Sequence, residues 1–252
     1  MMPWTKMHLY TLVPSYIVMF AIAMFLAKVL KDKGQFLIML PVRLVAIILV
    51  IMEIFKQVLS INKGYSLHHL PLHFCSMFVL LFPLFSFYYG KYREHIKVIT
   101  VVSSTCLLLF MIICPNTIFS DTSISEFFID FFSFHTVAFH NMVLFGLFYI
   151  MLAGLYELDR DRDHKSLSLS FSIYCFIACV MSQVLKENFN GFYTCPITIF
   201  EEFRLMLMDK IGWVAQLIYI VILWTLTVLF GIMCYWIVVG VDKGLKKLRE
   251  KH

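Results

Sequence analysis

Seven long apolar stretches dominate this sequence, and they constrain its fold more than any single motif does. Each is about 20 residues long, the length that a helix needs to cross the hydrocarbon core of a bilayer. A helix also satisfies its own backbone hydrogen bonds in lipid. The chain is 61% hydrophobic and 15% charged, whereas soluble domains carry about 25% charged residues. The predicted spans are 8–29, 35–57, 71–89, 96–114, 128–154, 167–186 and 212–240.

The connections between these stretches are too short to build a soluble core. We therefore predict an all-α polytopic membrane protein, a seven-transmembrane-helix bundle in which residues 1–252 form one transmembrane domain. Lys and Arg gather in alternate connections and in the tail after residue 240. Because basic residues mark the cytoplasmic side, the N-terminus is predicted outside and the C-terminus in the cytoplasm. The net charge of +5 then reflects topology and contact with anionic lipids, and no nucleic-acid-binding pattern is present.

The seven cysteines show no metal-binding or disulfide spacing. No Cys-x-x-Cys occurs, and most cysteines fall inside predicted spans, where a small apolar thiol packs well. A haem or metal site would need His68, His73, His135 and His140 to meet at one point. Helix angles argue against that meeting, so we expect no metal and no cofactor. No sequence feature predicts an oligomeric state.

Polar residues at membrane depth are the candidates for function, because they are costly there. Span 35–57 contains Arg43 and, near its outer end, Glu53. Span 71–89 opens within the stretch Leu-His-His-Leu-Pro-Leu-His-Phe-Cys-Ser-Met, residues 67–77. Pro71 suits a first helical turn, which would put Cys75 about one turn below the outer surface. The histidines of span 128–154 lie at a similar depth.

Helix geometry narrows the choice of partners. At about 100° per residue, His73 and Cys75 lie about 200° apart and cannot face one site. Ser133, Thr136 and His140 fall on one face of their helix, whereas His135 lies about 140° from His140. A thiol beside an imidazole and near a helix N-terminus can become a nucleophile and carry an acyl group as a thioester. Cys75 and His140 are the predicted pair, and a thiol that only packs in the core is the alternative.

The sequence allows more than one role for two other polar side chains, Arg43 and Gln183. Arg43 could extend to the inner surface, bind a lipid phosphate, or lock two helices together. Together with Gln183 in span 167–186 and with His140, it could line the path of a small-molecule transporter. Both Arg43 and Gln183 are predicted to contact substrate.

The motif Leu70-Pro71-Leu72-His73-Phe74-Cys75 resembles the Leu-Pro-Leu-His-x-Cys motif of the YwaF-like bacterial integral membrane proteins. Later features are similar to that family as well. His140 precedes Tyr149 by nine residues, Asn188-Phe189 precedes Pro196, and Gly212-Trp213 opens the last span. YwaF-like proteins look like relatives of the vertebrate transmembrane protein 164 type, described as cysteine-dependent acyltransferases acting on lysophospholipids.

This resemblance implies an acyltransferase or transacylase in a bacterial cell membrane, with phospholipids and lysophospholipids as its partners. Cys75 would accept the acyl group and His140 would be the general base, with His135 as the alternate base. His73 and Asn188 would be supporting polar groups at the substrate. A lipid-ester hydrolase with the same pair, and a transporter without chemistry, are the alternative functions.

Overall fold

The computed structural model describes residues 4–250, and every regular element within that range is helical. The elements are α1 (Lys6–Leu30), α2 (Gln35–Asn62), η1 (Leu67–His69), η2 (Phe74–Met77), α3 (Phe78–Phe87), α4 (Arg93–Ile113), η3 (Pro115–Thr117), α5 (Asp121–Ser125), α6 (Phe131–Ala153), α7 (Arg160–Leu185), α8 (Thr198–Ile211) and α9 (Trp213–Glu250). The all-α class is therefore confirmed. Six helices in the described range, α1, α2, α4, α6, α7 and α9, are long and apolar enough to cross a membrane.

The predicted count of seven spans is not reproduced, because the stretch 71–89 forms no long helix. Its first residues form a turn, and the helical part, Phe74–Phe87, contains the short helices η2 and α3. At 1.5 Å per residue, these 14 residues reach about 21 Å, less than the roughly 30 Å hydrocarbon core. Phe78, Phe82 and Phe85 of α3 are buried whereas Leu80 and Phe87 are exposed, so α3 is a short helix that packs one face against the core.

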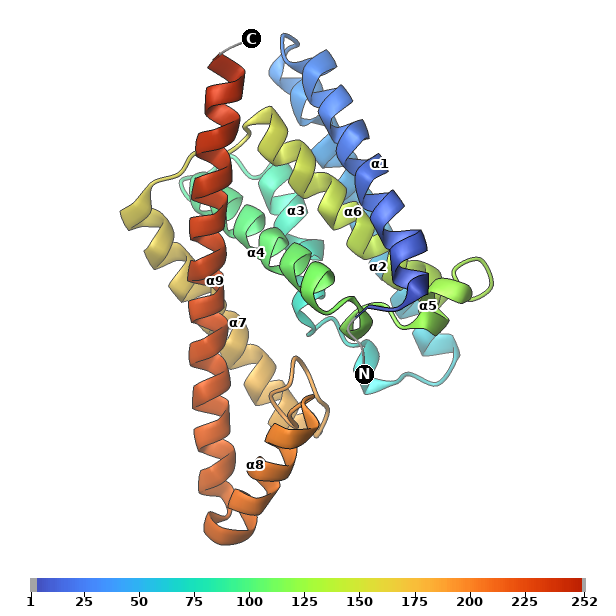
Figure 1. The fold of residues 1–252 in the computed structure, drawn as a ribbon, viewed down its shortest axis with the longest axis vertical. Coiled ribbons are helices and arrows are strands. Elements are labelled where there is room, and N and C mark those ends of the chain that lie inside the picture. Colours follow the sequence, from blue (N-terminus) through green and yellow to red (C-terminus); the bar gives the residue numbers. More distant parts are fainter. Residues whose placement is uncertain (1–3, 251–252) are drawn as a thin grey trace.

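The helices form a bundle and an arm (Figure 1). In the bundle, α1 and α2 both pack against α6, and α3 packs between α2 and α4. The arm consists of α7, α8 and the long helix α9, which packs against both α7 and α8. The helix α4 joins the two parts because it contacts α3 and α6 on one side and α7 and α9 on the other.

A glycine permits the closest packing in the bundle. The ring of Phe82, on α3, lies where a Cβ atom of Gly146, on α6, would be. Phe82 is fully buried, so its ring has little room to move aside. Gly146 thus allows α3, which continues directly from the turn that carries Cys75, to lie against α6.

The helix α8 was not predicted, because the sequence between 187 and 211 was interpreted as a connection. It lies beside the lower half of α9 in the arm (Figure 1). Its Arg204 side chain is buried although the helix carries exposed apolar residues such as Phe200 and Phe203. Arg204 donates to Glu201 on the same helix and to Gln216 on α9, which fixes the angle between α8 and α9.

Candidate functional site

Cys75 lies in the first turn of a helical stretch. His73 is the residue before η2, and its carbonyl accepts a hydrogen bond from the Ser76 amide at 2.9 Å. The helix begins at Phe74, three residues later than the predicted start at Pro71. The prediction that Pro71 occupies the first turn was therefore wrong, and the turn around Pro71 precedes the helix. Cys75 is partly buried and close to the free amide groups that every helix N-terminus presents.

A polar cluster of Glu53, Lys56, Gln57 and His135, of which Glu53 and His135 are buried, lies in the second half of α2 and near the start of α6. One carboxylate oxygen of Glu53, Oε1, accepts from Lys56 Nζ at 2.8 Å and from Gln57 Nε2 at 2.7 Å. The other oxygen, Oε2, lies 3.5 Å from His135 Nε2. Both of these atoms are buried, and neither makes a hydrogen bond within the described structure. The cluster thus holds one carboxylate oxygen and one imidazole nitrogen opposite each other at ion-pair distance without a hydrogen bond.

Side chains of α2 also hold the loop that leads to Cys75. Gln57 Nε2 donates to the His69 carbonyl at 2.8 Å, and Tyr65 donates its hydroxyl to Gln57 Oε1 at 2.6 Å. Ser60 Oγ and His69 Nδ1 are 2.6 Å apart, and the His69 ring stacks on Phe132. Burial and the nearby positive charge of Lys56 lower the pKa of His69, which favours its neutral form. The loop therefore has a fixed position against α2 and α6.

Of the three predicted catalytic residues, His135 contacts this cluster, whereas Cys75 and His140 lie within electrostatic range of its Lys56. Burial raises the pKa of the Cys75 thiol, while the charge of Lys56 acts to lower it and that of Glu53 to raise it. His135 and Lys56 also act electrostatically on His140. In the range from residue 4 to 250, no hydrogen bond links the Cys75 sulfur to an imidazole nitrogen. The predicted thiol–imidazole pair therefore shares one environment, with Lys56 as the common neighbour, but is not joined directly.

His140 has a defined orientation. Its Nδ1 lies 2.5 Å from the Thr136 carbonyl, which can only accept, so Nδ1 carries the proton of a neutral ring. The lone pair of that ring is then on Nε2. The rings of Phe119 and Phe139 pack edge-on against the imidazole. His140 thus has the form that a general base requires.

His135 packs among phenylalanines. Its ring stacks on Phe139 and lies 6.2 Å from the ring of Phe131. Its approach to Glu53 was not predicted, although Glu53 stood out in the sequence as a charge within a span. The spacing along α6 gives the direction of His135, but it does not tell which helix lies opposite.

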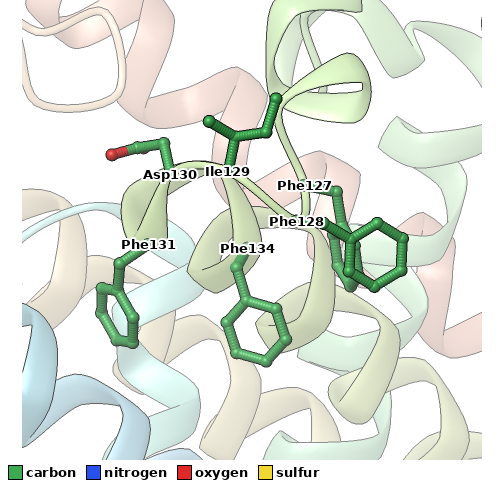
Figure 2. A pocket seen from close by; sticks show the side chains of 6 residues that line it. All are labelled: Phe127, Phe128, Ile129, Asp130, Phe131 and Phe134. Carbon is green, nitrogen blue, oxygen red and sulfur yellow. The ribbon is translucent and has the colours of Figure 1, made fainter.

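Phe131 also lines an apolar hollow of about 310 Å³ at the start of α6. Figure 2 shows its lining, which is formed by Phe127, Phe128, Ile129, Asp130, Phe131 and Phe134. Phe128 and Ile129 are 94% and 84% exposed. Side chains of this size and exposure at the end of a membrane helix are typical of contact with lipid. The hollow adjoins the polar cluster through the contact between the rings of Phe131 and His135.

The other side chains that were predicted to contact substrate form hydrogen bonds within the protein. His73 Nε2 bonds the His68 carbonyl at 3.1 Å, and its ring packs on Phe189. Asn188 Oδ1 accepts from the amides of Tyr193 and Thr194, both at 3.2 Å. These bonds shape the α7–α8 loop (residues 186–197), and Gln183 contributes to the same loop by donating to the Phe192 carbonyl at 2.8 Å.

Asn190 contacts the cysteine turn directly, although the sequence had indicated Asn188. Its side chain accepts from the Phe74 amide at 2.8 Å and donates to the Leu72 carbonyl at 3.0 Å. Only the Asn-Gly dipeptide at 190–191 could have drawn attention to it, because that pair is typical of a backbone with positive φ. Asn190 has φ of 55° and Gly191 has φ of 84°.

Arg43 lies at the other end of α2, ten residues or about 15 Å from Glu53. Its Nη2 donates to the Tyr89 hydroxyl at 2.8 Å, and its guanidinium lies over the rings of Phe36 and Phe87. Of the three interpretations of Arg43, these contacts correspond to the one in which it joins neighbouring helices. The structure does not bring it to Cys75.

Within residues 4–250, no three His, Cys, Asp or Glu side chains form a group that could hold a metal ion. A family model described as the TMEM164 family matches residues 3–234. No match was found among curated proteins or among solved structures. The six apolar helices together with this family indicate an integral membrane protein. Since the family model covers most of the chain, the protein belongs to the TMEM164 family.

Proposed function

We propose that this protein moves a fatty acyl chain between a phospholipid and a lysophospholipid within the membrane, with Cys75 as the nucleophile. The observation that carries the proposal is the placement of Cys75. Its thiol lies in a first helical turn, within electrostatic range of a polar cluster in which Glu53 Oε2 and His135 Nε2 approach to 3.5 Å without a hydrogen bond. Buried charge in a membrane protein costs stability and is a mark of function.

The reaction has two steps. In the first, the Cys75 sulfur attacks the ester carbonyl of a phospholipid, while a histidine takes the thiol proton. The ester C–O bond breaks, the acyl group stays on sulfur, and the lysophospholipid leaves with the proton from the histidine. In the second, a hydroxyl of an acceptor lysophospholipid gives its proton to the histidine and attacks the thioester. The thiol is restored when the histidine returns that proton to sulfur.

His140 is the proposed general base. Its Nδ1 is bound by the Thr136 carbonyl, so Nε2 is the atom that can take a proton. Catalytic hydrogen bonds often tighten only when substrate is bound, so the proposal requires lipid binding to bring the Cys75 thiol and the His140 imidazole together. His135, opposite Glu53, is the alternate base.

Lys56 supplies the positive charge that the first step requires. Its ammonium acts on Cys75 electrostatically and is held in place by Glu53 at 2.8 Å. A preorganised cation in a site with little water stabilises negative charge that develops on sulfur or on the carbonyl oxygen. This role gives a functional reason for an ion pair inside a membrane span.

The apolar hollow shown in Figure 2 supports the proposal that the substrate is a lipid. Its phenylalanines offer an apolar surface for an acyl chain, and its Phe131 ring adjoins His135. A lipid could therefore reach the site from the bilayer by lateral movement. The proposal places the protein in a bacterial cell membrane, in agreement with the resemblance of its cysteine motif.

The experiment uses purified protein in liposomes that contain a phospholipid with an alkyne-tagged acyl chain. Wild type should acquire a label on Cys75 that hydroxylamine removes, and added lysophospholipid should discharge it into new phospholipid. Cys75→Ala should acquire no label, whereas Cys179→Ala, which alters a partly buried thiol of α7, should behave as wild type. Equal labelling of Cys75→Ala and wild type would show that Cys75 is not the nucleophile. Release of free fatty acid in place of new phospholipid would assign the hydrolase alternative.

A further inference from the structure

The side chain of Asn190 bridges the turn that leads into Cys75. Oδ1 accepts from the Phe74 amide at 2.8 Å, and Nδ2 donates to the Leu72 carbonyl at 3.0 Å. The two bonds therefore hold both sides of His73, the residue before η2. They reach across more than 100 positions of sequence, from the arm to the bundle.

The Phe74 amide has a special need for this bond. The first amides of a helix have no partner within the helix, and a side chain at the cap usually supplies one. His73 occupies the cap position of η2 but makes no such bond. Asn190 thus performs from another element the task that a Ser or Asp at the cap performs locally.

Asn190 is itself held firmly by its own loop. Its φ of 55° lies in the left-handed region, which asparagine tolerates better than most residues. On one side, Ser182 of α7 bonds the backbone of Phe189. On the other side, Tyr219 of α9 donates to the Gly191 carbonyl at 2.6 Å. The carboxamide therefore has its position fixed by two helices of the arm.

We infer that Asn190 is a positioning residue, which sets the place of the Cys75 sulfur relative to Lys56 and the histidines by fixing the Leu72–Phe74 backbone. This inference rests on the proposed function of Cys75. The task requires a side chain with one donor and one acceptor, which an amide has and a carboxylate lacks. It also makes the arm part of the site, since the residue that orients the nucleophile comes from the α7–α8 loop.

Two substitutions separate the side chain from the backbone. Asn190→Gly removes both hydrogen bonds but keeps the left-handed conformation accessible. Asn190→Asp keeps an acceptor for the Phe74 amide but places a carboxylate against the Leu72 carbonyl. The matched control is Asn188→Asp, because the Asn188 side chain serves only as an acceptor for Tyr193 and Thr194, and a carboxylate can accept both bonds.

The first readout is independent of any acyl transfer. Amide exchange at Phe74 should become about tenfold faster in Asn190→Gly, as expected for the loss of one hydrogen bond. The rate at which N-ethylmaleimide alkylates Cys75, relative to Cys179 in the same sample, should change in both Asn190 variants. Asn188→Asp should match wild type in both measurements. If Asn190→Gly retains the melting temperature, the Phe74 exchange and the Cys75 alkylation of wild type, the inference is overturned.

The second readout is the rate of thioester formation on Cys75. Both Asn190 variants should slow it by about tenfold or more with little change in the lipid concentration at half-maximal rate, because Asn190 orients the thiol and does not touch lipid. Changed exchange and alkylation in a protein whose wild type never forms a thioester would uphold the positioning of Cys75 and reject the proposed function. Unchanged exchange with normal thioester formation would do the reverse.

Discussion

The bundle and the arm each contain a buried cation beside a carboxylate, and the two clusters differ in how completely their atoms are bonded. In the arm, the Arg204 guanidinium donates to both oxygens of Glu201 and to Gln216, and Glu201 also accepts from the Cys195 amide. In the bundle, Glu53 Oε2 and His135 Nε2 lie 3.5 Å apart without a hydrogen bond.

This difference separates a cluster that holds the fold from one that is available for chemistry. A fully bonded buried ion pair has no atom left for a substrate, and its geometry fixes two helices. An incompletely bonded one costs stability, since buried polar atoms are nearly always satisfied. Its position within electrostatic range of the Cys75 thiol supports a functional role for the bundle cluster.

The largest expected effect comes from removing Lys56 alone. Lys56→Met leaves Glu53 buried without its cation, so the free energy of unfolding should fall by about 3–5 kcal/mol. Thioester formation on Cys75 should fall about 100-fold or more. Denaturant unfolding in mixed micelles and the alkyne label measure the two quantities.

The double variant Glu53→Leu/Lys56→Met separates these effects. Replacing both charges by apolar side chains of similar size is often neutral for stability, so the double variant should regain most of the lost stability but none of the labelling. The matched pair in the arm, Glu201→Leu/Arg204→Met, should keep the labelling near wild type. If labelling were lost in the arm variant and kept in the bundle variant, the arm cluster and not the bundle cluster would be the one that the reaction needs.

The next effect concerns the packing that supports Cys75. Gly146→Ala places a methyl group in the ring of Phe82, and overpacking of this kind costs about 1–3 kcal/mol. Gly240→Ala, on α9 where a Cβ atom meets nothing, should instead stabilise the helix by up to about 1 kcal/mol. Thermal unfolding of the two variants measures both. Equal stabilities would show that α3 and α6 are not packed as described.

The smallest effect is the response of the arm to acid. The hydrogen bond from Arg204 holds the pKa of the Glu201 carboxyl below its usual value. A carboxyl with a lowered folded pKa stabilises the fold above its unfolded pKa of about 4.3, and that contribution is lost as pH falls through the folded pKa. Because solvent screens the partly exposed Glu201, the loss should stay below about 1 kcal/mol. Protection of the α8 amides, corrected for their intrinsic exchange rates, should therefore fall below about pH 4 in wild type, while Arg204→Met should show no such fall.

Much of the fold could be predicted because lipid imposes a strict pattern. The stretches 35–57 and 128–154 correspond closely to α2 and α6, since a spanning helix needs about 20 apolar residues. The prediction of a membrane span over 71–89 was wrong because apolar composition does not distinguish a span from a short buried helix. The turn at Pro71 and the start of the helix at Phe74 depend on contacts with α2 and the α7–α8 loop.

The candidate site was predictable within one helix and not between helices. Angles along α6 placed His135 and His140 in different directions, and the structure gives His135 Glu53 and His140 the Thr136 carbonyl as a polar partner. Those angles carry no information about the element opposite, so the approach of Glu53 to His135 was not predicted. Asn188 and Asn190 illustrate the same limit in a loop, where two residues with the same side chain face different partners because the backbone at Asn190 has positive φ.

The central claim is that Cys75 carries an acyl group during turnover. Intact peptide mass spectrometry after a brief incubation in liposomes should find the peptide with Cys75 heavier by one fatty acyl group, and hydroxylamine should remove it. Lys56→Met should prevent that acylation, and Arg204→Met should permit it. Acyl transfer that continues in Cys75→Ala, or an acyl group found on another residue, would contradict the account.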